Sequence, residues 1–205
     1  MHSQNNEEEV ILSVFGNRTG TFLDLGMNDG ITLSNTYALA ELGWKGLGVE
    51  ANKDAFVRAD IKHLKHKDVL VFNCAVSDYN GVGKFYSSGS HLSNNDVGLL
   101  SSLNEKETQK WRGTTSFAET EIDVIDFARL MKLSPYKRYE FISIDVEGSE
   151  LEILPQMNLK ELGCELLCIE FNGDKLKKEL IMSYCANHGL KNLLLENLEN
   201  LILSI

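Results

Sequence analysis

The sequence predicts an α/β fold with a doubly wound, mostly parallel sheet and an antiparallel hairpin at its carboxyl end. Short apolar runs alternate with segments of helical periodicity over residues 21–76. Two further apolar runs surround a turn at residues 197–200. A length of 205 residues is typical of one domain, so we expect residues 1–205 to form a single domain.

The expected strands are short and apolar, and the expected helices lie between them. Residues 21–25 are apolar except for Asp24 and too short for a helix, so they predict a buried strand. A helix is expected over 31–42, with Asp29 as its N-cap and Gly43 just beyond its end. The other expected strands are 46–50, 69–76, 84–87, 119–124, 141–146, 166–171 and two within 193–205, and the other expected helices are 7–15, 52–64, 126–132 and 175–187.

Two of the later helices carry local signals. Ser149 and Glu152 have the spacing of a capping box, ahead of a short helix that Pro155 interrupts. The helix at 175–187 is amphipathic, and we expect its apolar side to consist of Leu176, Leu180, Ile181 and Tyr184.

Charge and cysteine usage limit the partners and the compartment. The formal net charge of -10 repels polyanions, so nucleic acid is not expected as a partner, although a local basic patch is compatible with that charge. The four cysteines form no CxxC pair, and Cys74 and Cys168 lie in apolar runs, which favours buried thiols in a reduced, intracellular setting. Neither a secretory signal nor an apolar run of membrane-spanning length is present, so we expect a cytoplasmic protein without a membrane span.

The loop after the first expected strand, GMNDG at 26–30, has the composition of a nucleotide-type cofactor loop. Gly26 and Gly30 let backbone N–H groups approach a ligand closely. A dinucleotide site would have a third glycine in this loop, and that glycine is absent. Asp29 would crowd a pyrophosphate and instead suits a cationic or zwitterionic ligand, such as the amino-acid end of S-adenosylmethionine.

The other expected strands of the sheet also end in polar residues. Glu50 ends the second strand, where a carboxylate can accept hydrogen bonds from both ribose hydroxyls of a nucleoside; the alternative is a solvated surface glutamate. Because ligands of open α/β sheets bind at the carboxyl ends of the strands, we expect these residues to face one crevice. The remaining polar strand ends are 73–76, 145–147 and 170–172.

Four segments, in order, resemble the FkbM family of S-adenosylmethionine-dependent methyltransferases. They are LDLGMNDGITLSNT at 23–36, GWKGLGVEAN at 43–52, AVSD at 75–78 and IDVEGSELEIL at 144–154. The resemblance implies a class I methyltransferase (Rossmann-like) fold with a seven-stranded sheet that ends in an antiparallel hairpin. It also implies O-methylation of a hydroxyl, usually on a sugar or another natural product.

The resemblance further implies a role for each matched position. Gly26, Asn28 and Gly30 would line the methionine end of the cofactor, Glu50 would bind the ribose, and Asp145 would lie beside the sulfonium and the methyl acceptor. Ala75 and its neighbours would form the adenine edge. The full set of expected cofactor-binding residues is Gly26, Met27, Asn28, Asp29, Gly30, Asn35, Glu50, Ala51, Cys74, Ala75 and Asp145.

Methyl transfer to an alcohol needs either a base that removes the hydroxyl proton or a metal ion that lowers the pKa of the hydroxyl. The candidate catalytic residues are Asp145, Glu147, His91 and Glu170. Our hypothesis is that Asp145 orients the acceptor and that Glu147 or His91 takes the proton. In an extended chain, alternation places Asp145 and Glu147 on the same side.

Three alternatives stay open at this point. Asp145, Glu147 and Glu170 offer oxygen ligands of the kind that magnesium or calcium binds, but no spacing is diagnostic, so a divalent metal is compatible with the sequence and is not predicted. A non-catalytic module that keeps a nucleoside pocket for sensing or assembly is the second alternative. A nicotinamide-dependent oxidoreductase is the third, and the missing third glycine argues against it.

The polar segment at 88–115 is long for a loop inside a compact domain, and such loops are usually functional or disordered. We favour a segment that covers the substrate. Its polar groups and Trp111 would suit a carbohydrate or another small-molecule acceptor, although an ordinary surface loop has the same composition. The residues concerned are His91, Asn94, Asn95, Ser101, Ser102, Trp111 and Arg112. The sequence does not indicate an oligomeric state.

Overall fold

A computed structural model of the chain describes residues 1–92 and 96–205, so Asn94 and Asn95 lie outside the described residues. Among the described residues, no helix is long and apolar enough to cross a membrane. The elements in chain order are α1 (Glu7–Phe15), β1 (Thr21–Leu25), α2 (Tyr37–Glu41), β2 (Lys45–Val49), α3 (Lys53–His63), β3 (Val69–Phe72), β4 (Ala75–Ser77), β5 (Gly81–Ser88), α4 (Glu105–Lys110), β6 (Phe117–Asp126), α5 (Phe127–Leu133), β7 (Phe141–Ile144), α6 (Glu150–Ile153), the 3₁₀ helix η1 (Leu154–Gln156), α7 (Leu159–Leu162), β8 (Leu166–Glu170), α8 (Lys175–Asn187), β9 (Asn192–Glu196) and β10 (Asn200–Ser204).

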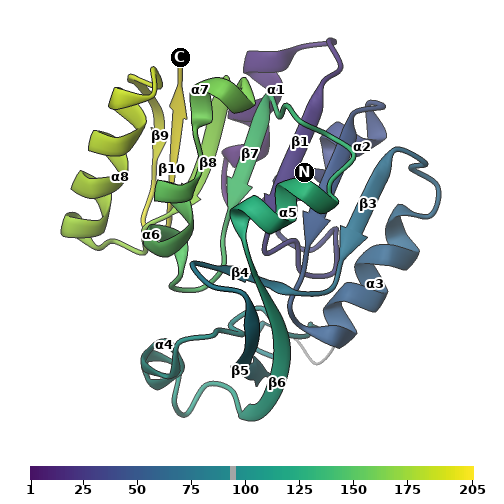
Figure 1. Ribbon diagram of the computed structural model, residues 1–205, viewed down its shortest axis with the longest axis vertical. Helices are drawn as coiled ribbons and strands as arrows, with labels where there is room; N and C mark the ends of the chain where they lie inside the picture. Colours follow the sequence, from purple (N-terminus) through teal and green to yellow (C-terminus); the bar gives the residue numbers. More distant parts are fainter. Residues whose placement is uncertain (93–95) are drawn as a thin grey trace.

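The fold is built on a seven-stranded sheet with the order β3-β2-β1-β7-β8-β10-β9 (Figure 1). The first five of these strands are parallel to one another, and β10 is antiparallel to both β8 and β9. This order and the antiparallel hairpin confirm the predicted fold class.

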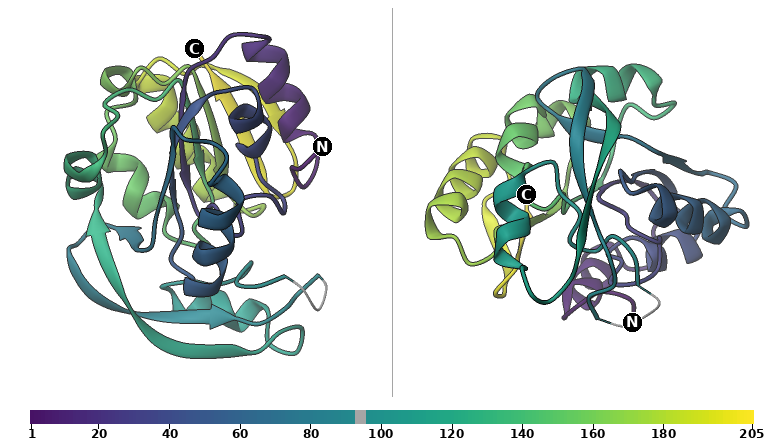
Figure 2. Two further views of the ribbon diagram at one scale, coloured as in Figure 1. Left: turned by 90° about the vertical axis from the view of Figure 1, so that its right-hand side faces the viewer. Right: turned by 90° about the horizontal axis from the view of Figure 1, so that it is seen from below.

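Helices cover both faces of the sheet (Figures 1 and 2). Alternation along β1 explains the two layers, because Phe22 packs with apolar residues of α1, α2 and α3, whereas Leu23 and Leu25 pack with those of α5 to α8. All three side chains are fully buried. The first strand is therefore the centre of a sheet buried on both sides, as its apolar run predicts.

The register of the central strands places their carboxyl ends at one level. Leu25 of β1 pairs with both Val49 of β2 and Ile144 of β7. The next residue of each strand is therefore at the same edge of the sheet. These residues are Gly26, Glu50 and Asp145.

A smaller sheet of three strands, β4-β6-β5, lies beyond this edge (Figures 1 and 2). The prediction of one strand over 69–76 is wrong, because β3 belongs to the large sheet and β4 to the small one. Asn73 separates them: its side-chain amide donates hydrogen bonds to the carbonyls of Glu50 and Ala51, at 2.8 and 3.0 Å. The strands expected at 84–87 and 119–124 are the central parts of the longer β5 and β6.

The helix predicted over 31–42 is also wrong in its first half, since α2 begins only at Tyr37. Asp29 does not cap a helix. Its carboxylate accepts hydrogen bonds from the backbone N–H groups of Ile31 and Thr32 and from the Thr32 hydroxyl. Leu33 then has a φ of 56°, which is incompatible with a right-handed helix.

Two further local predictions fail for identifiable reasons. Ser149 is at the N-cap position of α6, but its side chain makes no capping hydrogen bond, so there is no capping box. Helix α6 ends at Ile153, and Pro155 lies in the 3₁₀ helix η1 that follows directly. Helix α8 has the predicted bounds but a different buried side. Leu176 and Leu180 are 65% and 49% exposed, and the buried residues are Ile181 and Cys185.

Candidate active site

A deep cavity lies at the carboxyl edge of the large sheet, between this edge and the small sheet. Strand ends and the loops that follow them supply one side of its lining, and segment 88–115 supplies much of the other. The polar and charged residues of the lining are Gln4, Asp24, Asn28, Thr32, Ser34, Asn35, Glu50, His91, Ser101, Ser143, Asp145, Glu147, Ser149, Glu170, Asn172, Glu199 and Asn200.

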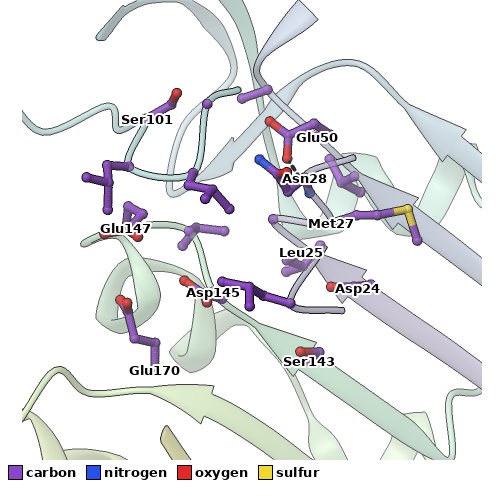
Figure 3. A pocket seen from close by; sticks show the side chains of 18 of the residues that line it. Asp24, Leu25, Met27, Asn28, Glu50, Ser101, Ser143, Asp145, Glu147 and Glu170 are labelled. Carbon is purple, nitrogen blue, oxygen red and sulfur yellow. Dashed lines mark hydrogen bonds between the residues drawn. The ribbon is translucent and has the colours of Figure 1, made fainter. Parts of the chain in front are cut away.

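The loop after β1 lies directly against the loop after β7. Gly26 has a φ of 90°, and a Cβ atom at this position would lie 1.6 Å from the Asp145 carbonyl oxygen. No other residue type fits there, because a side chain would meet backbone atoms. Gly26 therefore allows the two loops to meet at the floor of the cavity. Met27 packs its side chain against Gly48 and away from the carboxylates of the cavity (Figure 3).

Glu50, at the end of β2, forms a hydrogen bond with the loop at 26–30. One carboxylate oxygen accepts a hydrogen bond from the N–H of Asn28 at 2.7 Å, and the other accepts one from the N–H of Asn52 at 2.6 Å. Burial raises the pKa of Glu50 to about 7, although these two hydrogen bonds act in the opposite direction. Each oxygen keeps a second lone pair, so the carboxylate can still accept hydrogen bonds from a ligand in the cavity.

Asp24 also lines the cavity, although it is not one of the predicted site residues. Its carboxylate accepts a hydrogen bond from the Thr36 hydroxyl at 2.5 Å. Burial raises the pKa of Asp24 to about 6, and the Thr36 hydroxyl partly offsets this rise. A single acid within an apolar buried strand was the available signal, because such a charge needs a partner or a ligand.

Three of the predicted catalytic carboxyls converge at the ends of β7 and β8 (Figure 3). Burial raises the pKa of Asp145 to about 7, and the nearby charge of Glu150 adds to this rise. Burial, followed by the charge of Asp145, also raises the pKa values of Glu147 and Glu170 well above the usual range. This crowding of carboxyls favours a bound proton or a cation.

The loop that carries Glu147 is not extended, although the sequence predicts an extended chain from Asp145 to Glu147. Strand β7 ends at Ile144, and Glu147 has a φ of 54° in the left-handed region. Such a conformation is costly for a residue with a side chain and tends to occur at functional sites. Asp145 and Glu147 both line the cavity nevertheless.

The carboxylates that come closest together differ from the metal set considered from the sequence. Among the described residues, one oxygen each of Asp145, Glu150 and Glu170 lie within 4.8 Å of one another. Glu150, and not Glu147, completes this group. Glu170 Oε2 is buried and has no hydrogen-bond partner among the described residues.

The segment at 88–115 contributes an aromatic pair to the cavity. The rings of His91 and Trp111 meet edge to face with their centroids 5.1 Å apart, and both residues line the cavity. The Nδ1 atom of His91 is buried and has no hydrogen-bond partner among the described residues. Near the amino terminus, Gln4 donates a hydrogen bond to Glu199, and both of these residues also belong to the lining.

Most of the predicted site residues therefore lie together, and two do not. Asp29 and Gly30 are outside the lining, because Asp29 binds Thr32 and Gly30 packs against His63 and Ala59 of α3. Asn35 reaches the lining and donates a hydrogen bond to Ser143 at 3.2 Å. The predicted residues that line the cavity are Gly26, Met27, Asn28, Asn35, Glu50, Ala51, Cys74, Ala75, His91, Asp145, Glu147 and Glu170.

The charges of the cavity have one sign. Among the described residues, its lining includes no lysine or arginine. Acidic side chains come from both ends of the cavity and are Asp24, Glu50, Asp145, Glu147, Glu170 and Glu199. A cationic ligand is therefore favoured over an anionic one.

Comparison with known proteins agrees with this geometry. Residues 24–189 match the methyltransferase FkbM domain. No match was found among curated proteins.

The fold is similar to those of several solved methyltransferases, each only distantly related in sequence. The METTL16 methyltransferase domain has a TM-score of 0.56 at 12% identity, over 97% of this chain and 66% of that one. A putative RNA methyltransferase from Pyrococcus horikoshii has a TM-score of 0.52 at 12% identity, over 97% and 81% of the two chains. A precorrin-6y C5,15-methyltransferase from Geobacter metallireducens has a TM-score of 0.51 at 10% identity, over 97% and 86%.

The chain spans 63% of a second METTL16 methyltransferase-domain structure, so it is shorter than some of the proteins that share its fold. Since all these identities are low, the likeness establishes a class I methyltransferase fold and does not identify an acceptor.

Proposed function

We propose that this chain, which belongs to the FkbM methyltransferase family, methylates a hydroxyl group of a sugar or another small natural product with S-adenosylmethionine. Family and fold support S-adenosylmethionine-dependent methyl transfer. The observation that carries the finer proposal is the convergence of Asp145, Glu147 and Glu170 on one side of the cavity. Burial raises the pKa of Asp145 to about 7, which suits a group that interacts with a hydroxyl proton near neutral pH.

The residues of the cavity fit S-adenosylmethionine. Its sulfonium and ammonium groups match a lining with six acidic residues and no lysine or arginine among the described ones. Glu50 would bind the ribose hydroxyls, Asp145 would lie near the sulfonium, and Cys74 with Ala75 would contact the adenine. The loop at Gly26 and Asn28 would hold the methionine end. When bound, the cofactor supplies an electrophilic methyl group.

We propose a different role for Asp29 from the cofactor contact that the sequence predicts. A direct bond from its side chain to the cofactor ammonium stays a prediction, but its hydrogen bonds to Thr32 favour a role in shaping the loop. Asp24, which faces the cavity, is a better placed carboxylate for the ammonium or for a water beside it.

For the transfer itself, this chain has to orient the acceptor and remove its proton. Asp145 would hold the acceptor hydroxyl, and the proton would pass to Glu147 or to Nδ1 of His91. The deprotonated acceptor oxygen held by these residues would bond to the methyl carbon as the carbon–sulfur bond breaks, which would leave a methyl ether and a neutral thioether. Because charge disappears in this step, much of the rate enhancement would come from alignment of the two reactants.

The acceptor class rests on the other side of the cavity. Trp111 offers a ring face for a sugar, and the polar side chains around it can bind hydroxyls. Asn172, Glu199 and Asn200 extend this polar surface from the ends of β8 and the β9–β10 hairpin. A phosphorylated acceptor or a nucleic acid would meet an acidic lining, so we expect neither.

The experiment is an acceptor screen with purified protein and S-adenosylmethionine, followed by mass spectrometry. The proposal predicts products that gain one methyl group on oxygen, and it predicts that D145N loses them while binding the cofactor. Cofactor binding without transfer to any hydroxyl would favour the non-catalytic alternative. Transfer to nitrogen or carbon alone would keep the methyltransferase and exclude O-methylation.

A further inference from the structure

Lys177 of helix α8 reaches the carboxyls at the end of β7 and β8 from outside the cavity lining. Its Nζ atom is 2.6 Å from Glu150 Oε2 and 3.7 Å from Glu170 Oε2. The side chain of Lys177 is only 14% exposed, and that of Glu150 is completely buried. Among the described residues, Lys177 is the one lysine or arginine that forms an ion pair with either glutamate.

Glu150 connects this ammonium to the loop that carries the candidate catalytic groups. Its second oxygen, Oε1, accepts hydrogen bonds from the N–H groups of Val146 and Gly148, both at 3.1 Å. The loop follows Asp145 and contains Glu147 in its left-handed conformation. Any change at Lys177 would therefore be transmitted through one buried carboxylate to the backbone on both sides of Glu147.

The same carboxylates have the arrangement of a cation site. Oxygens of Asp145, Glu150 and Glu170 lie within 4.8 Å of one another, and hard divalent cations prefer oxygen ligands of this kind. Glu170 Oε2 is buried without a hydrogen-bond partner among the described residues, whereas Glu150 accepts hydrogen bonds at both of its oxygens. A buried set of carboxylates needs a counter-charge.

We propose that the ammonium of Lys177 is the permanent cation of this site, that it takes the place of a divalent metal ion between Asp145, Glu150 and Glu170, and that it thereby holds the loop at 145–148. Lys177 is a positioning residue and not a catalytic one, because it acts through Glu150. Its importance for turnover rests on the proposed function, whereas its competition with a metal ion does not.

The geometry explains why a metal and Lys177 exclude each other. A metal ion bound to Glu150 would lie close to the ammonium, which is already at hydrogen-bond distance from the same carboxylate. Two positive charges at such a separation repel strongly where water is scarce. Removal of the ammonium would leave the oxygens free to bind a divalent ion.

The test is a titration with Mn²⁺ followed by electron paramagnetic resonance, without any acceptor. The variants are K177M, K177R and, as a matched control, K178M; Lys178 is the next residue of the same helix and pairs with the more exposed Glu196. We expect K177M to bind one Mn²⁺ at least about tenfold more tightly than the wild type. The wild type, K177R and K178M should remain at background, and K177M/E170Q should lose the gain.

The proposal is overturned if K177M gains no Mn²⁺ affinity, or if the wild type binds Mn²⁺ at a site that E170Q removes. Should K177M fail to fold by circular dichroism, K177Q replaces it, and the wild-type titration alone still decides whether a metal shares the site. Once an acceptor is known, K177M should lose at least about tenfold in turnover, and Mn²⁺ should restore part of the loss. A wild type that transfers no methyl group would contradict the proposed function and leave the Mn²⁺ result intact.

Discussion

The two ends of the cavity use the same residue type in different ways. At the cofactor end, both oxygens of Glu50 accept backbone hydrogen bonds and Asp24 is bound by Thr36. At the acceptor end, Asp145, Glu147 and Glu170 crowd together, and Glu170 Oε2 has no hydrogen-bond partner among the described residues. Carboxylates fixed by hydrogen bonds suit a binding platform, whereas carboxyls that destabilise one another's charge suit the uptake of a proton.

The contact between the two ends depends on Gly26, so Gly26→Ala should have the largest effect. A Cβ atom 1.6 Å from the Asp145 carbonyl would separate the loops, and the left-handed backbone adds strain. We expect the free energy of unfolding to fall by roughly 3 kcal/mol or more, with loss of cofactor binding. Urea denaturation and calorimetry measure these two effects.

Gly43→Ala is the matched control for this variant. Gly43 has a φ of 85°, and a Cβ atom there would meet nothing within 4 Å. This variant should lose only about 1 kcal/mol and should bind the cofactor normally. Equal losses for the two variants would contradict a steric role for Gly26.

Asp145→Asn should affect mainly the acceptor end. We expect methyl transfer to fall by about 10² to 10⁴, because the amide cannot carry the charge that orients the acceptor hydroxyl. Cofactor affinity should change much less, since Glu50 and the loop at Gly26 remain. Single-turnover kinetics and calorimetry separate these quantities. Full turnover in both D145N and H91A would refute the assignment of the acceptor end.

Glu50→Gln should affect the cofactor end alone. Both carboxylate oxygens accept N–H groups, so an amide would direct its own N–H₂ group at one of those donors. We expect cofactor affinity to fall by roughly 10- to 100-fold, as is usual for a lost charge-assisted hydrogen bond.

D29N should lose less cofactor affinity than E50Q when binding is measured by calorimetry, because Asp29 lies outside the lining of the cavity. A greater loss for D29N would restore the sequence-based prediction for Asp29.

The smallest expected effect is a pH dependence of stability that involves both ends. Burial raises the pKa of Asp24 to about 6 and those of Glu50 and Asp145 to about 7, so the folded state binds protons more tightly than the unfolded state. These three groups should therefore lower the free energy of unfolding as the pH rises from about 4 to about 7, by about 1.4 kcal/mol for each unit by which a pKa is raised. Burial lowers the pKa of His63 to about 4, so His63 acts in the opposite direction over the same range and makes the net effect smaller. Urea denaturation across this range measures the slope. E50Q removes the contribution of Glu50, so its stability should fall less steeply with pH than that of the wild type over this range. Equal slopes for the two proteins would show that burial does not raise the pKa of Glu50.

The large sheet could be predicted from the sequence because its signals are local. Apolar runs such as 21–25 and 166–171 specify buried strands, and the acids at their ends fall at one edge by topology alone. The helix at 31–42 failed because Asp29 and the left-handed Leu33 build a turn that competes with a helix. The strand at 69–76 failed because Asn73 binds backbone from a different loop, which is a tertiary contact.

The carboxylates of the site could be predicted where a residue ends or follows a strand. Glu50 and Asp145 follow β2 and β7, Glu170 is the last residue of β8, and all three line the cavity. Asp24 was missed because it lies inside a strand, and Lys177 because its partner Glu150 is 27 residues away in the chain. Gln4 and Glu199 meet across almost the whole sequence, so no local pattern relates them to the cavity.

The most direct test of this account is calorimetry of S-adenosylmethionine binding to the wild type near pH 7, in two buffers that differ in ionisation enthalpy. A cation should lower the pKa values of Asp24, Glu50 and Asp145 in the cavity. We expect one bound cofactor per chain, with net release of protons that is smaller in D145N. Absence of binding, or proton uptake on binding, would contradict it.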